Sequence, residues 1–321
     1  MEPVVCIVIP AYNEERAIGD TVGEYRRAFP RARILVVDNN SLDGTSAAAA
    51  KAIDPATDLL LFEPRQGKGS AVKRGLSRLT ADVYIMTDGD STYPAEDARK
   101  LYDELILSRA DMLVGDRVTG GAYGQQNKRL GHSLGNQLLT TVISGLAGQS
   151  YNDVLSGLRV MSGPFVSALD MRSAGFQLET ELNIIAAYLR ADVIERPIAY
   201  RQRDEGSVSK LNTIRDGIRI LAFALTNWIS FAPMQAFSLL AMASWLVAAS
   251  LGYRAISGFI ESGWPYTTTA VTGAAAGMFG ALALFTGLTL RVLGRDSRRR
   301  EIARFLETKR SWNARLDAGT I

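Results

Sequence analysis

Two carboxylates lie one residue apart in the segment Asp88-Gly89-Asp90, directly after a short apolar run at residues 83–87. Burying both carboxylates inside a sheet would cost much free energy, so a loop at the end of a strand is the favoured place for them. In such a loop they can share a hard divalent cation, since Mg²⁺ commonly uses one or two carboxylates together with phosphates. Alone, the triplet is a weak signal because it also occurs by chance in surface loops.

Further polar segments follow the first two apolar runs of the chain. Pro10-Ala11-Tyr12-Asn13-Glu14 follows the first run, and Asp38-Asn39-Asn40-Ser41 follows the second. If the runs are parallel strands, these segments lie at the carboxyl edge of the sheet, where open α/β sheets bind ligands. For Asp38 we favour a hydrogen bond to a nucleotide base, whereas Asp43 and Thr45 are more typical of a turn or helix cap.

The segment Gly67-Lys68-Gly69 precedes a predicted helix. Backbone N–H groups at a helix start and one ammonium would converge there, which favours a bound diphosphate. The spacing is not that of a Walker loop.

Short apolar runs alternate with helical patterns through the first 200 residues, which predicts an α/β domain with a mainly parallel, Rossmann-like sheet covered by helices. Ile18, Val22, Tyr25 and Phe29 recur at helical spacing, so one face of a helix should pack inward. A second helix is predicted from Gly69, and Pro94 opens a third. The predicted strands are residues 4–9, 33–37, 59–62, 83–87 and 112–114.

The average composition of the 321 residues, 47% hydrophobic and 21% charged with a net charge of +3, conceals two long uncharged runs. No charged side chain occurs from Ile220 to Tyr253 or from Ser262 to Leu290. Each run exceeds the roughly 20 residues that cross a bilayer core, so residues 232–290 are predicted to form a transmembrane hairpin. Residues 211–231 show the pattern of an amphipathic helix at the membrane surface.

Residues 291–321 carry nine Lys and Arg against four Asp and Glu, and are predicted to form a basic cytoplasmic tail. Because two crossings return the chain to the side from which it started, the domain at residues 1–210 should also be cytoplasmic. The acidic N-terminus does not favour a signal peptide, and Cys6 is the only cysteine, which excludes a disulfide scaffold. Nucleic-acid binding has no support beyond the basic tail.

Several strings in this order resemble the family 2 glycosyltransferases of GT-A fold, and most closely the polyprenyl-phosphate glycosyltransferases that include dolichyl-phosphate mannose synthase. The strings are VVCIVIPAYNEE, ILVVDNNSLDGT, RQGKGSAVKRGL, YIMTDGDSTYP and DVLSGLRVMS. The resemblance covers residues 4 to about 211. It implies a sheet with a nucleotide-sugar site followed by membrane segments.

Carried over by position, the resemblance implies a nucleotide-sugar site and a Mg²⁺ or Mn²⁺ site. The first is lined by Pro10, Tyr12, Glu14, Asp38, Lys68, Asp88 and Gly89. Asp88 and Asp90 would bind the metal, with Asp90 also catalytic. The sequence departs from the dolichyl-phosphate mannose synthases at Thr92, where they have a glutamine that assists the metal.

The resemblance also places the phosphate of an acceptor lipid among Arg117, Lys128, Arg129 and Ser133. Arg203 lies in a later basic segment that would close over the phosphates and act in catalysis. Asp153 matches an acidic position that could serve as a base, orient Arg159 or only stabilise a turn. Glu179 and Glu181 are reserve candidates at the start of a helix.

The implied reaction is inverting transfer of a sugar from a UDP- or GDP-sugar to polyprenyl phosphate at the cytoplasmic face of the membrane. One alternative is a membrane-bound transferase that acts on a hydroxyl of a lipid-linked saccharide or polymer, and another is a non-catalytic nucleotide-sugar-binding module. The Q-x-x-R-W string of processive polysaccharide synthases is absent, and no G-x-G-x-x-G follows the first strand, as a Rossmann dehydrogenase would require. By analogy with the group, a homo-oligomer is possible.

Overall fold

The computed structural model describes residues 2–119, 140–145, 148–175, 177–202 and 213–321. The chain forms two compact units, the first from Met1–Ala224 with Ile302–Ile321 and the second from Leu225–Glu301. Residues 302–321 thus belong to the first unit, whereas the sequence predicted a separate tail from residue 291.

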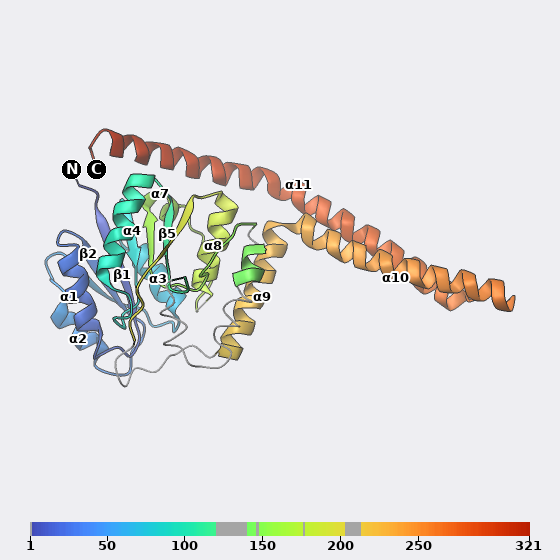
Figure 1. Cartoon of the computed structure of the whole chain (residues 1–321), viewed down its shortest axis with the longest axis horizontal. Coiled ribbons are helices and arrows are strands. Elements are labelled where there is room, and N and C mark those ends of the chain that lie inside the picture. The colour runs from blue at the N-terminus through green and yellow to red at the C-terminus, as the bar shows by residue number, and fades with distance from the viewer. Residues whose placement is uncertain (1, 120–139, 146–147, 176, 203–212) are drawn as a thin grey trace. The chain divides into compact units, whose positions relative to one another are not determined.

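The first unit is built on a seven-stranded sheet with the order β3-β2-β1-β4-β6-β5-β7 (Figure 1). All neighbouring pairs are parallel except those of β6, which runs antiparallel between β4 and β5. The five predicted strands are present, and the mainly parallel sheet is confirmed. The strands are β1 (Val5–Ala11), β2 (Arg33–Asp38), β3 (Leu59–Phe62), β4 (Val83–Met86), β5 (Met112–Asp116), β6 (Arg159–Ser162) and β7 (Val193–Pro197).

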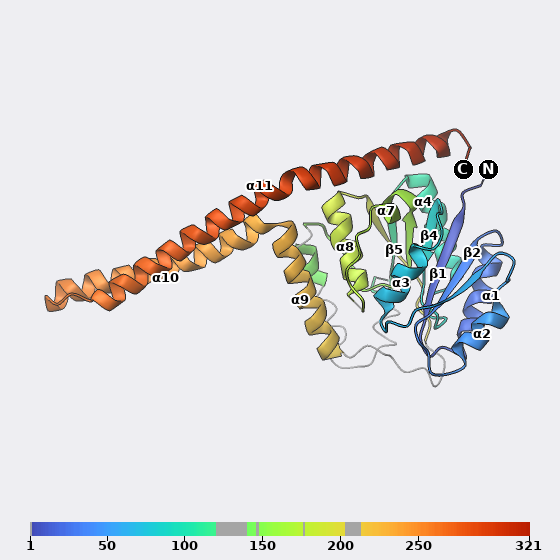
Figure 2. The same ribbon diagram turned by 180° about the vertical axis from the view of Figure 1, so that it is seen from behind.

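Helices cover both faces of this sheet, and alternate strand residues point to opposite faces. Ile7 and Ile85 belong to the apolar cluster of one face, and Figure 1 shows α1 (Ile18–Ala28) and α4 (Ala95–Ser108) on that face. Val8 and Met86 belong to the apolar cluster of the other face, and Figure 2 shows α3 (Lys68–Leu76) and α8 (Leu178–Leu189) there. Two shorter helices of the unit are α2 (Thr45–Ala52) and α7 (Gly163–Ser167).

The end of α11 (Thr267–Asp317) lies across the amino-terminal edge of the sheet. Trp312 is fully buried in the apolar cluster of one face, and Phe305 is buried in the cluster of the other. Lys309 Nζ lies 2.7 Å from Asp111 Oδ2 and 2.6 Å from Asp192 Oδ2, and these aspartates directly precede β5 and β7. Residues 302–321 are therefore part of the core of the first unit.

The second unit contains a hairpin of α10 (Pro233–Ser262) and the first part of α11. Both helices are long and apolar enough to cross a membrane, and little of either apolar window is buried. They approach closely at glycines, since a Cβ on Gly280 would lie 2.6 Å from Trp245 Nε1. The predicted pair of candidate membrane spans is confirmed.

A 19-residue helix, α9 (Thr213–Phe231), occupies the place of the predicted amphipathic helix. Ile218, Leu225 and Ile229 are exposed and lie at intervals of two turns and one turn, whereas Ile220 is buried. This exposed apolar face suits a helix that lies at a membrane surface.

Candidate active site

The Asp88-Gly89-Asp90 segment forms a turn directly after β4, at the carboxyl edge of the sheet. Asp90 is buried, and its Oδ1 accepts hydrogen bonds from Thr92 Oγ1 (2.6 Å) and Thr92 N (3.3 Å). The backbone N of Ser91 donates to Thr21 Oγ1 of α1. Thr92, the position at which the sequence departs from the dolichyl-phosphate mannose synthases, therefore orients Asp90 from within the turn.

Asp88 and Asp90 fit a divalent cation by the chemistry of their donor atoms. Carboxylate oxygens are hard ligands, and Mg²⁺ is commonly held by one or two carboxylates with substrate phosphates and water. Across the described ranges, no group of three or more His, Cys, Asp and Glu side chains could hold a metal. The two aspartates therefore suit a cation whose other ligands come with the substrate.

Lys68 reaches this turn from the start of α3. Its ammonium lies 2.5 Å from Asp88 Oδ1 and 2.7 Å from Glu179 Oε1. Burial opposes the charge, but the carboxylates of Asp88 and Glu179 outweigh it and raise the pKa of Lys68. The side chain is therefore a permanent cation beside the expected metal site, and Glu179 is its second partner.

Gly157 lies against the same ion pair from the loop that precedes β6. A Cβ at this position would be 2.7 Å from Asp88 Oδ2 and 2.9 Å from Lys68 Nζ. Its backbone N donates to the hydroxyl of Tyr93 at 2.8 Å. Only glycine allows this loop to approach the carboxylate so closely.

Two N–H groups of the expected cradle at Gly67–Ser70 already have partners within the protein. Gly67 N donates to Asn39 Oδ1 (2.7 Å), and Ser70 N donates to the carbonyl of Ala174 (3.1 Å). A Cβ on Gly67 would lie 2.2 Å from that carbonyl. These two N–H groups are therefore not open to a diphosphate, and Lys68 supplies a positive charge at this helix start.

The other residues expected to bind the nucleotide follow β1 and β2 at the same edge. Pro10 pairs with Val37, and the next pair in the register is Ala11 with Asp38. Asp38 is buried, and its Oδ1 accepts a hydrogen bond from the backbone N of Ser41. Tyr12 and Glu14 follow the end of β1, and the backbone N of Glu14 donates to Thr45 Oγ1.

Asn39 is a structural residue of this edge that the sequence did not single out. Its Nδ2 donates to the carbonyls of Glu63 and Arg65, and its Oδ1 accepts from Gly67 N. One buried amide thus joins the loops after β2 and β3 to the start of α3. Its position after Asp38 was the only available signal.

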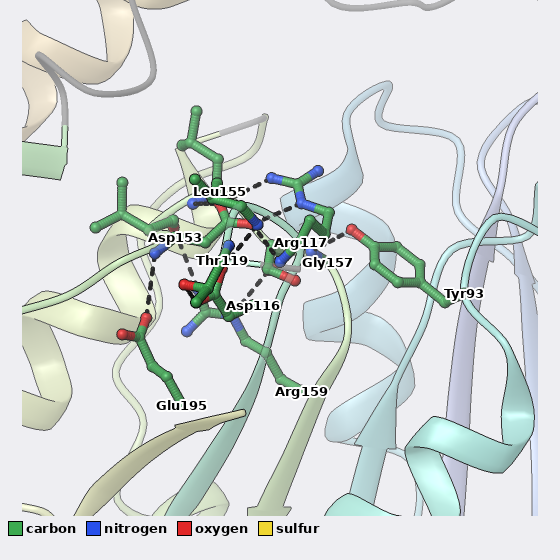
Figure 3. A network of polar contacts seen from close by, with 12 residues as sticks. Tyr93, Asp116, Arg117, Thr119, Asp153, Leu155, Gly157, Arg159 and Glu195 are labelled. Atoms are coloured by element: carbon green, nitrogen blue, oxygen red, sulfur yellow. Dashed lines mark hydrogen bonds and ion pairs between the residues drawn. The ribbon is translucent and has the colours of Figure 1, made fainter. Parts of the chain in front are cut away.

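Arg117 and Asp153 form a buried ion pair, which Figure 3 shows. Arg117 Nε donates to Asp153 Oδ2 at 2.7 Å and Nη2 donates to Oδ1 at 2.9 Å. Burial alone would raise the pKa of Asp153, but the charge and hydrogen bonds of Arg117 hold it below its usual value. A carboxylate with a lowered pKa is a weak base at neutral pH.

Asp153 does not orient Arg159, which was one of its three expected roles. Arg159 Nη1 donates to Asn183 Oδ1 (2.7 Å), whereas Nε and Nη2 donate to the carbonyls of Ser156 (3.1 Å) and Val154 (3.2 Å). Asp153 lies on the same loop but pairs with the guanidinium of Arg117, which follows β5. Arg159 therefore stabilises the loop through its carbonyls, whereas Arg117 is positioned by Asp153 of that loop.

Tyr93 and Tyr200 lie between the Asp88–Asp90 turn and the Arg117–Asp153 pair. Neither tyrosine was predicted as a site residue. Their rings meet edge to face with centres 5.4 Å apart, and the guanidinium of Arg117 lies 5.5 Å from the centre of the Tyr200 ring. Next in the chain, Arg201 N donates to the carbonyl of Thr92 at 2.9 Å. The segment leading to Arg203 thus passes beside the Asp88–Asp90 turn.

Four predicted site residues lie outside the described residues. These are Lys128, Arg129, Ser133 and Arg203.

Comparison with known proteins shows which family this chain resembles. Residues 6–161 match the sequence pattern of the family described as glycosyl transferase family 2. Glycosyltransferase AglJ of Haloferax volcanii is 30% identical over 290 residues, covering 88% of this chain and 91% of the relative. Polyprenol monophosphomannose synthase of Mycolicibacterium smegmatis is 28% identical over 232 residues, covering 69% of this chain and 85% of the relative. Undecaprenyl-phosphate mannosyltransferase of Micrococcus luteus is 29% identical over 213 residues, covering 63% and 85%.

Among solved structures, the fold is similar to glucosyl-3-phosphoglycerate synthase from Mycobacterium tuberculosis, in complex with Mn²⁺, UDP and glucosyl-3-phosphoglycerate. The TM-score is 0.55 at 18% identity, over 69% of this chain and 80% of that one. This likeness concerns the fold alone and supports the expected GT-A architecture. With the extent of the match to AglJ, these results show that the chain belongs to glycosyl transferase family 2, in the group that contains the polyprenyl-phosphate sugar transferases.

Proposed function

We propose that this enzyme transfers a sugar from a UDP- or GDP-sugar to a polyprenyl phosphate at the cytoplasmic face of a membrane, with inversion at the anomeric carbon. The observation that carries the proposal is the pairing of two charged clusters at one sheet edge. Lys68, Asp88 and Asp90 form a donor half, and the buried Arg117–Asp153 pair forms an acceptor half. The names of the relatives from M. smegmatis and M. luteus support a polyprenyl phosphate acceptor.

In the donor half, the leaving nucleoside diphosphate gains negative charge as the glycosidic C–O bond breaks. The Lys68 ammonium stabilises that charge because Asp88 and Glu179 hold it in place before the reaction. Asp88 and Asp90 would hold Mg²⁺ or Mn²⁺, which when bound supplies Lewis-acid stabilisation of the diphosphate. Arg203 is proposed to approach the phosphates from the segment that follows Arg201.

In the acceptor half, a phosphate oxygen forms the new bond to the anomeric carbon, while the electron pair of the broken bond leaves with the diphosphate. A phosphate monoester has a second pKa of about 6, so this oxygen is already anionic at neutral pH and needs no general base. Asp153 keeps Arg117 extended for the acceptor phosphate, and we place Lys128, Arg129 and Ser133 around the same phosphate. A hydroxyl acceptor would require a base, and the lowered pKa of Asp153 argues against it in that role.

The membrane arrangement follows from the division of the chain. Residues 302–321 share the core of the unit formed by residues 1–224, so both parts must be on the same side of a membrane. This arrangement requires an even number of crossings between them, and α10 with the first part of α11 supplies two. The basic cluster with Arg295, Arg299 and Arg300 favours the cytoplasm for that side.

The direct test incubates the purified full chain in detergent with undecaprenyl phosphate, Mg²⁺ or Mn²⁺ and a panel of UDP- and GDP-sugars. We expect one donor to give an acid-labile sugar-phospholipid. A parallel reaction with a lipid-linked saccharide, whose phosphates are blocked, examines the hydroxyl alternative. Product only in the second reaction, or in neither, would contradict the proposal.

A further inference from the structure

Asn183 is fully buried on α8, and its side chain both accepts and donates a hydrogen bond. Its Oδ1 accepts from Arg159 Nη1 at 2.7 Å, and its Nδ2 donates to the carbonyl of Val154 at 3.2 Å. Its backbone carbonyl also accepts from the hydroxyl of Tyr151 at 3.1 Å. An amide offers one acceptor and one donor group together, and neither a carboxylate nor an aliphatic side chain can replace both.

Arg159 depends on this amide. Within the described ranges, no carboxylate lies within ion-pair distance of its guanidinium. A buried cation is costly unless its N–H groups are satisfied, and Arg159 satisfies them with Asn183 and the carbonyls of Val154 and Ser156. Arg159 and Asn183 together therefore fix two points of the loop at residues 153–157, the carbonyls of Val154 and Ser156.

This loop determines the position of Arg117 (Figure 3). Asp153 lies at its start and holds Arg117 with two hydrogen bonds. Glu195 of β7 accepts from the backbone N of Asn152 (2.7 Å) and of Asp153 (3.3 Å), so the loop is held from a second direction. A shift of the loop would move the guanidinium that faces the acceptor.

Glu179 lies one helical turn before Asn183, so the two side chains share a face of α8. Glu179 holds Lys68 in the donor half, whereas Asn183 holds the loop of the acceptor half. One face of α8 therefore contributes a residue to each half of the site, Glu179 to the donor half and Asn183 to the acceptor half.

We propose that Asn183 is a positioning residue for the acceptor phosphate, acting through Arg159, the loop at residues 153–157 and the Arg117–Asp153 pair. This inference rests on the proposed function. It assigns to Asn183 an effect on acceptor binding that is separate from donor binding.

The test compares Asn183→Asp and Asn183→Leu in the reconstituted full chain with undecaprenyl phosphate and the preferred sugar nucleotide. In Asn183→Asp, the carboxylate can still accept the hydrogen bond from Arg159, so this buried cation keeps a partner. The hydrogen bond to the carbonyl of Val154 is lost, because a carboxylate has no N–H group. We expect its acceptor KM to rise about tenfold and its donor KM to stay within about twofold. Asn183→Leu should have a larger effect, because it also removes the neutral acceptor of Arg159.

Thr180→Val is the matched control. Thr180 is buried on the same helix, and in the part of the chain that the structure describes its hydroxyl has no hydrogen-bond partner. This variant should keep both KM values. If Asn183→Asp turned over with an unchanged acceptor KM, or if both KM values rose equally, the inference would be overturned. A wild-type protein that formed no sugar-phospholipid would instead overturn the proposed function, and this inference with it.

Discussion

Asp153 and Arg117 form a two-point ion pair in which both side chains are buried and each oxygen of the carboxylate accepts one N–H group of the guanidinium. Two N–H groups that meet the two carboxylate oxygens form the bidentate pairing in which arginine binds carboxylates and phosphates most strongly. Asp153 therefore supports a cation at the acceptor half of the site. It is poorly suited to accept a proton.

Replacing this carboxylate by an amide should weaken acceptor binding. Asp153→Asn keeps the shape but leaves the buried charge of Arg117 without its counter-ion, so we expect the acceptor KM to rise at least about tenfold. The free energy of unfolding should also fall by about 3–5 kcal/mol, the range for breaking a buried pair. Steady-state kinetics and chemical denaturation measure the two effects. Asp170→Asn is the control, since Asp170 and Arg172 form an exposed pair that should contribute almost nothing.

The pH dependence should come from the acceptor and not from Asp153. Because the folded pKa of Asp153 is lowered, the ion pair contributes full stability above its unfolded pKa of about 3.9, and loses it only as pH falls through the lower folded value. Asp153 therefore does not titrate between pH 5 and 8. The acceptor kcat/KM should fall below about pH 6, as the phosphate gains a proton, in wild type and Asp153→Asn alike. If the fall in acceptor kcat/KM below about pH 6 disappeared in Asp153→Asn, Asp153 would be identified as the general base.

Removing one carboxylate of the expected metal site should abolish transfer without unfolding the protein. In Asp90→Asn the amide oxygen can still accept from Thr92, so the turn after β4 should remain intact. We expect kcat to fall at least about 100-fold. EDTA should inactivate the wild type, and added Mg²⁺ or Mn²⁺ should restore it. Asp103→Asn, which changes an exposed carboxylate of α4, serves as the control. Full activity in Asp90→Asn would exclude Asp90 as a metal ligand.

A methyl group at position 157 should disturb the donor half. In Gly157→Ala the new Cβ would lie within 3.0 Å of Asp88 Oδ1 and Oδ2 and of Lys68 Nζ, so the ion pair must separate or shift. We expect at least about a tenfold loss of kcat with little change in thermal stability, because the displaced atoms are side-chain ends. Gly19→Ala in α1, where a Cβ meets nothing within 4 Å, should leave the activity unchanged. Equal activity of the two variants would show that this close approach has no role.

The C-terminal residues should stabilise the catalytic unit. Trp312 is fully buried among residues of β1, α1 and α4, so Trp312→Ala should lower the free energy of unfolding by about 3–5 kcal/mol. Thermal unfolding of the purified full chain would detect this as a lower Tm. Trp264→Ala removes an exposed tryptophan and should leave the Tm unchanged. Similar Tm values for both variants would mean that residues 302–321 do not belong to the folded core.

Much of the fold could be predicted from local patterns. The strands β1 to β5 have apolar runs bounded by polar turns, and α1 shows a clear helical spacing of buried residues. The two membrane candidates depend only on length and the absence of charge. The Asp88–Asp90 turn was equally accessible, because both aspartates directly follow an apolar strand.

Other features depend on contacts between distant parts of the chain. β6 inserts antiparallel between β4 and β5, and its four residues carry no pattern that reveals this place. Asp153 pairs with Arg117, 36 residues away, although Arg159 is much nearer in sequence. Lys68 pairs with Glu179, which the sequence offered only as a reserve candidate.

The C-terminal segment shows the same limit. Its charged residues predicted a basic cytoplasmic tail separate from the domain, but Phe305 and Trp312, two helical turns apart, are buried on opposite faces of the sheet. The sequence by itself determined the element types, the family motifs and the residues able to bind metal and phosphate, because these depend on neighbouring residues. Only the tertiary structure decided which charges neutralise each other and which N–H groups remain for a ligand, because burial and pairing depend on distances through space.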